Sequence, residues 1–110
     1  MSKNAKLPEP PYYAVIFPNQ RTGDDEEGYQ KMAARMTELA QMQPGCLGYE
    51  STRDESGFGI TVSYWRDEVS IRAWKAEAEH LEAQRLGKKK WYKAFALRIA
   101  KIERAYDFEK

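Results

Sequence analysis

The chain has 110 residues, 42% hydrophobic and 32% charged, which is typical of one globular domain and argues against a disordered chain. Eighteen Lys and Arg residues against seventeen Asp and Glu give a net charge of +1, so no overall field favours nucleic acid or an anionic membrane. No apolar run could span a bilayer and no secretory signal opens the chain, which predicts a cytoplasmic protein. The single cysteine, Cys46, excludes an intrachain disulfide and is interpreted as a small buried residue rather than a reactive thiol.

The N-terminal segment divides into an arm and a strand. Residues 1–11 contain three prolines and are predicted to form an extended arm, ahead of a single domain over residues 12–108. The stretch YYAVIF, residues 12–17, is aromatic and β-branched, and predicts a strand that Pro18 terminates. Because this strand is apolar on both faces, we expect both faces of its sheet to be covered.

A helix and a hairpin are predicted next. The acidic run 24–27 suits the first turn of a helix, where negative charge meets the positive end of the helix dipole. Apolar residues then recur at helical spacing until Pro44 and Gly45 end the helix. Residues 46–65 show β character on both sides of the turn DESG, which predicts an antiparallel hairpin.

The C-terminal half begins with a second helix, capped by Asp67 and ended by Gly87 and the basic run 88–90. The final segment fits both a strand and a helix by its spacing; we predict a short helical turn over 91–93 and a strand from about Phe95 to Tyr106. The order β-α-β-β-α-β is the ferredoxin-like arrangement, a four-stranded antiparallel sheet with two helices on one face. Two helices leave the other face open, which predicts a homodimer packed sheet to sheet. The second helix directs one apolar line inward: Ile71, Trp74, Ala78 and Leu81.

These elements, with the passages PGCLGYES and GITVSYWRDEVSIRAWKAEAEH, resemble the antibiotic biosynthesis monooxygenase-like domains over nearly the whole chain. The resemblance implies a dimeric α/β barrel with one cavity per protomer, between its sheet and helices. Members of that family include cofactor-independent oxygenases that convert phenolic aromatics to quinones, and haem-degrading enzymes. In the first group the deprotonated substrate itself supplies the electron to dioxygen, so the protein needs an aromatic pocket and a few polar groups.

Five residues are candidates for such a site. Trp74 is a core residue or a cavity wall, and His80 is a general base or a surface residue at the flank of its helix, since histidine titrates near neutral pH. Tyr64 and Arg98 are candidates to bind a phenolate. The alternative is that Tyr64 is an ordinary core aromatic residue and that Arg98 forms an ordinary ion pair. Trp65 faces either the helices or the partner's sheet, and the dimer interface is the preferred interpretation.

Three functional alternatives remain. The first is a cofactor-independent oxygenase of a small aromatic, the second a small-ligand-binding or interaction dimer without catalysis, and the third a haem protein. The haem-degrading relatives place a histidine where this chain has Gln84, and their strand asparagine corresponds poorly to Asn19, which follows Pro18. The run GKKKWYK is interpreted as a solvated helix end rather than a nucleic-acid site. Neither a metal nor a cofactor is expected.

Overall fold

The computed structural model describes residues 3–80 and 90–110, and the side chains of all of these except 78–80. The described elements are seven, in the order β1 (Tyr12–Arg21), α1 (Glu26–Met42), β2 (Cys46–Arg53), β3 (Phe58–Trp65), α2 (Glu68–His80), β4 (Tyr92–Phe95) and β5 (Arg98–Ile102). The ferredoxin-like β-α-β-β-α-β order is confirmed, with the last strand divided in two.

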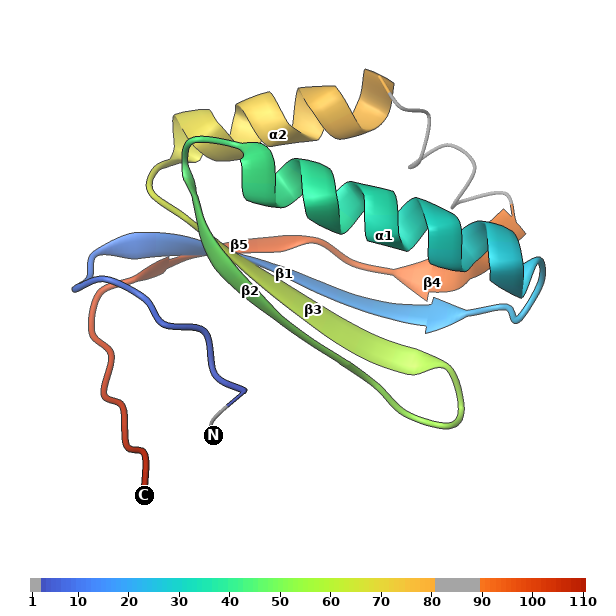
Figure 1. Cartoon of the computed structure of the whole chain (residues 1–110), viewed down its shortest axis with the longest axis horizontal. Helices are drawn as coiled ribbons and strands as arrows, with labels where there is room; N and C mark the ends of the chain where they lie inside the picture. Colours follow the sequence, from blue (N-terminus) through green and yellow to red (C-terminus); the bar gives the residue numbers. More distant parts are fainter. Residues whose placement is uncertain (1–2, 81–89) are drawn as a thin grey trace.

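The strands form one antiparallel sheet in the order β2-β3-β1-β4, and β5 also pairs with β1. Both helices lie over one face, while the two terminal segments run below the other (Figure 1). We call these the helix-facing side and the outer face. Directly paired residues share a face of an antiparallel sheet, so the pairing of Tyr13 with Trp65 places both on one side and that of Ala14 with Tyr64 places both on the other.

Strand β1 continues through Pro18 to Arg21, so the prediction that Pro18 ends the strand is wrong. Proline lacks the N–H that a ladder requires, and an interior strand tolerates it only where that hydrogen bond is dispensable. Here the carbonyl of Pro18 accepts a bond of 3.1 Å from the N–H of Ala96, which lies in the break between β4 and β5. Pro18 therefore lies beside the break between β4 and β5, where no regular ladder requires its backbone N–H.

The last segment also differs from its prediction. Tyr92 and Lys93 belong to β4 and not to a helical turn, and the strand predicted from Phe95 to Tyr106 is broken at residues 96–97 and ends at Ile102. Beyond that residue the chain has no regular structure and runs across the outer face (Figure 1).

Both helices begin where the sequence predicts. The Asp25 side chain accepts a hydrogen bond from the N–H of Gly28 at the start of α1, and the Asp67 side chain does the same for Ser70 at the start of α2. The hairpin turn over residues 54–57 is also confirmed, closed by the N–H of Asp54 donating to the carbonyl of Phe58 at 2.8 Å. Neither described helix is long and apolar enough to cross a membrane.

The outer face is covered at one end by the chain's own termini. Tyr12 and Ala14 are buried there, and the backbone N–H of Ala5 in the arm donates to the Glu50 carboxylate of β2 at 3.0 Å. The arm and the C-terminal tail are also joined, by an ion pair of 2.6 Å between Lys6 and Glu109. The other end of this face is open. Ile60 is 38% exposed there, and Phe58 is exposed as well.

Candidate functional site

Trp65 and Trp74 are stacked on the helix-facing side. Their ring centroids are 6.2 Å apart with an angle of 22° between the planes, and the Trp65 indole N–H donates to the Ser63 hydroxyl at 2.8 Å. Trp65 is 0% exposed, so the interpretation of this residue as part of a dimer interface is wrong. Its ring fills the space below α2 because the alternation of β3 turns it toward the helices. Trp74 is half-buried. This degree of burial fits a residue that packs on the core with one part of its ring and forms a cavity wall with the other.

Tyr64 and Arg98 do not lie with the two tryptophans. Tyr64 alternates with Trp65 along β3, and its phenol donates to the Glu50 carboxylate at 2.6 Å on the outer face. Arg98 pairs with Ile16 of β1, which shares that face, and its side chain is exposed. Both residues are therefore separated from Trp74 by the sheet, and they cannot border a cavity under α2.

His80 is the last residue of α2, and its side chain lies outside the described residues. The same holds for the inward positions Ala78 and Leu81 and for Gln84. The predicted end of this helix at Gly87 also lies outside the described residues.

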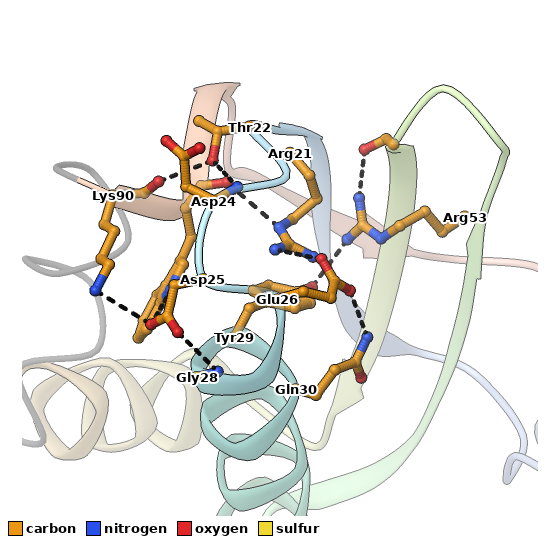
Figure 2. A network of polar contacts seen from close by, with 12 residues as sticks. Arg21, Thr22, Asp24, Asp25, Glu26, Gly28, Tyr29, Gln30, Arg53 and Lys90 are labelled. Atoms are coloured by element: carbon orange, nitrogen blue, oxygen red, sulfur yellow. Dashed lines mark hydrogen bonds and ion pairs between the residues drawn. The ribbon is translucent and has the colours of Figure 1, made fainter.

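A cluster of polar side chains occupies the other end of the helix-facing side. Asn19, Gly59 and Arg53 are aligned across β1, β3 and β2 by the strand register. Arg53 extends over Gly59, and its guanidinium donates to the Asn19 side-chain oxygen at 2.8 Å and to the Tyr29 hydroxyl of α1 at 3.0 Å. A third bond of 2.6 Å goes to the carbonyl of Gly57 in the hairpin (Figure 2). We call Asn19, Tyr29, Arg53 and Tyr92 the polar cluster.

Asn19 is the most deeply buried member of the polar cluster, at 2% exposure. Its side-chain N–H donates to the carbonyl of Phe17 at 3.1 Å, while its oxygen accepts from Arg53. Both ends of the amide are thus fixed, which holds it at one orientation on the floor of the sheet. The expectation that Asn19 lies outside the first strand is wrong, because β1 includes it.

Aromatic rings lie within the polar cluster and beside it. Tyr92 meets Tyr29 edge to face, with centroids 6.0 Å apart, and meets Phe17 in the same way at 5.6 Å. Burial raises the pKa of Tyr92 well above its ordinary value, and the adjacent Tyr29 raises it further by charge and by a hydrogen bond. Tyr92 is therefore neutral near pH 7. Phe17 is only half-buried although it points toward the helices, so the helices do not fully close over this part of the sheet.

Arg21 supports the cluster from the end of β1. Its guanidinium carbon lies 3.2 Å from the centre of the Tyr29 ring, and its charge is paired with Glu26 of α1 at 3.1 Å (Figure 2). The pKa of the Glu26 carboxyl is lowered, first by a hydrogen bond from Gln30 and then by the bond from Arg21. Tyr29 is thereby clamped between α1 and the sheet.

The chemistry that these groups offer is anion stabilisation rather than proton removal. Arg53 supplies a cationic guanidinium, Asn19 supplies a neutral amide, and Tyr92 keeps its proton. A guanidinium and an amide lower the pKa of a bound phenol and hold the resulting phenolate, but they do not accept its proton. Within residues 3–80 and 90–110 there is no group of three or more side chains suited to hold a metal ion.

Residues 12–86 match the family described as antibiotic biosynthesis monooxygenase. The chain belongs to this family. The uncharacterized protein YqjZ of Bacillus subtilis (strain 168) is 47% identical to it over 105 residues, which are 96% of this chain and 91% of that protein.

Solved structures resemble the chain at low sequence identity. A variant of SnoaB, a cofactor-independent oxygenase from Streptomyces nogalater, gives a TM-score of 0.72 at 12% identity, over 87% of this chain and 97% of the other. PA3566 from Pseudomonas aeruginosa gives 0.69 at 15% identity, over 90% of this chain and 99% of the other. At such identities these likenesses establish the fold alone.

Sequence reasoning missed the polar cluster because its members come from four separate elements. Part of a signal was available in the sequence: Arg53 and Gly59 flank the DESG turn, so a hairpin brings them near each other, and the register pairs them directly. A glycine opposite a long cationic side chain leaves room for that side chain to cross the sheet.

Proposed function

We propose that the protein oxidises a small phenolic aromatic without a cofactor, on the helix-facing side of the sheet. The aromatic rings around the polar cluster and the stacked pair Trp65 and Trp74 suit a planar apolar substrate. The observation that carries the proposal is the fixed pair of Asn19 and Arg53, a buried amide and a guanidinium joined at 2.8 Å beneath half-covered aromatic rings. Membership of the monooxygenase family agrees with it.

In this reaction the substrate loses the phenol proton, and the electron-rich anion transfers an electron to dioxygen. For an anthrone-like phenol, one oxygen atom is inserted at a CH₂ group to give the quinone carbonyl. The second oxygen atom leaves as water with the two hydrogens of that CH₂ group. Asn19 and Arg53 stabilise the anion. His80 is the candidate base, since none of the described members of the polar cluster accepts a proton near pH 7.

The test is an oxidation assay with an anthrone or a hydroxynaphthalene, following oxygen uptake and quinone absorbance together. We expect turnover by the wild type, a loss of about tenfold or more in Asn19→Ala, and a loss of about 10²–10⁴-fold in His80→Gln if His80 is the base. Retained turnover in both variants would refute the assigned roles. Binding of the phenol by the wild type without quinone formation would refute the oxygenase.

Binding without turnover is the second candidate function. One observation favours it: the Asn19 and Arg53 side chains are bonded to each other and to Tyr29, as in a site built to hold an anion rather than to transfer a proton. Haem binding draws no support from the described residues.

We further propose that the protein is a homodimer, since members of the family are typically dimers. The open end of the outer face, around Ile60 and Phe58, is the surface that a second copy would cover. Trp65 has no place in that interface.

A further inference from the structure

Two hydroxyl side chains, those of Ser51 in β2 and Thr61 in β3, lie on the helix-facing side of the sheet next to the polar cluster. They are directly paired across the two strands, and their hydroxyl oxygens are 2.7 Å apart. We call them the hydroxyl pair. Thr61 is also paired with Phe17 of β1, so two hydroxyls and an aromatic ring form one row across the sheet. The next row along β3 on this side is that of Gly59, which contains Asn19 and lies about 7 Å away.

The helices do not seal this row. Tyr29 is the one buried residue of α1, a helix that the structure describes throughout. Met32 and Met36 share the face of Tyr29 at helical spacing, and both are only half-buried. On the sheet, Thr61 and Phe17 are half-buried as well. A packed core would exclude water from both layers, so the two layers are in incomplete contact here and both keep surface that a ligand can cover.

The hydroxyl pair can still form hydrogen bonds to a ligand. Each hydroxyl has one proton and two lone pairs, and the bond between them uses only one proton and one lone pair. Neither hydroxyl makes another hydrogen bond to a described residue, so one O–H donor and lone pairs on both oxygens remain. Such a pair can donate to a carbonyl oxygen or accept from a phenol. Ser51 is exposed and Thr61 is half-buried, so a ligand can approach both.

We propose that the hydroxyl pair binds a second oxygen substituent of the phenolic substrate, at the end of the molecule away from the phenolate. This inference rests on the proposed function, because Asn19 and Arg53 determine where the first oxygen lies. The two rows are about 7 Å apart, a distance that two fused aromatic rings with oxygens at opposite ends can span while they lie on Phe17. The substrate class is therefore a fused-ring aromatic with oxygen substituents at both ends, rather than a compound with a single hydroxyl.

The experiment compares 2-naphthol with naphthalene-2,6-diol, which differ only in the second hydroxyl. Binding to the full-length protein is measured by titration calorimetry without dioxygen, so that oxidation cannot consume the ligand. The diol should bind about three- to tenfold more tightly, which is the effect of one added hydrogen bond. Thr61→Val keeps the branched shape and removes the hydroxyl, so it should abolish this advantage without weakening the binding of 2-naphthol.

Two further variants separate this inference from the proposed function. Thr52→Val makes the same substitution at an exposed residue that is paired with Ile60 on the outer face, and should leave both affinities unchanged. Asn19→Ala should weaken both ligands alike, since both carry the first hydroxyl. Equal wild-type affinities for the two ligands, or equal losses of both in Thr61→Val, would overturn the inference and leave the hydroxyl pair a role in the sheet alone. If neither ligand binds the wild type, the phenol site is refuted, and the inference with it.

Discussion

Arg53 crosses the sheet directly over Gly59. A Cβ atom at residue 59 would lie 2.9 Å from the guanidinium carbon of Arg53 and 2.8 Å from the carbonyl oxygen of Thr52, closer than such atoms approach in folded proteins. The absence of a side chain at this position is therefore what allows the guanidinium to reach Asn19 and Tyr29.

Gly59→Ala should lower the free energy of unfolding by about 1–3 kcal/mol, since overpacking moves the guanidinium and strains the backbone. Urea denaturation measures the change. The matched comparison is the same substitution in an Arg53→Ala background, where one of the two close contacts is gone. The loss should be smaller there, and equal losses in both backgrounds would contradict the proposed coupling of the two residues.

The stacked tryptophans should differ in their contribution to stability. Trp65→Ala should lower the free energy of unfolding by about 3–5 kcal/mol, because its ring is wholly buried and leaves a cavity. Trp74→Ala should lower it by about 1–3 kcal/mol, because the Trp74 ring is only partly buried. A loss at Trp74 as large as that at Trp65 would identify Trp74 as a plain core residue rather than a wall.

Alkaline pH should destabilise the fold through Tyr64. Burial, followed by the hydrogen bond to Glu50, raises the pKa of Tyr64 well above its ordinary value. The folded state therefore keeps this proton to higher pH than the unfolded chain does. The contribution is fully present below about pH 10 and declines as pH rises above it, because the unfolded chain ionises first.

Urea denaturation between about pH 8 and pH 11 tests this expectation. Tyr64→Phe should reduce the slope of stability against pH, and Tyr106→Phe removes an exposed phenol of the tail as the matched control. An unchanged slope in Tyr64→Phe would mean that other groups cause the alkaline loss.

The sequence was informative where local rules act alone. The caps Asp25 and Asp67 and the DESG turn depend on residues within a few positions of one another, and the elements form as predicted. Pro18 shows the limit of such rules. Whether Pro18 ends the strand depends on the residue beside it in the neighbouring strand. That residue is Ala96, which is far along the chain and is not visible to a local rule.

The site was harder to predict because it depends on which face of the sheet each side chain occupies, and residue type alone does not determine that face. Tyr64 and Trp65 are adjacent aromatic residues, yet the alternation of β3 sends one to the termini and the other to the helices. Which face the helices cover follows from tertiary packing and not from the strand's own pattern. Asn19 and Arg53 are brought together by the register of three strands. No short stretch of the sequence contains that information.

The open end of the outer face should form the contact between two copies of the chain. Ile60 stands at its open end, beyond the part that the arm and tail cover, and a two-fold axis would bring the same surface of a second copy against it. Ile60→Lys should then weaken the dimer by about 100-fold or more, since each protomer would bury an unpaired charge. Val69→Lys adds the same charge at an aliphatic residue of α2 that is 64% exposed, and should leave assembly intact. Sedimentation velocity across a concentration series measures both variants. A wild type that is monomeric at micromolar concentration, or equal effects of the two lysines, would show that the open end of the outer face is not the interface.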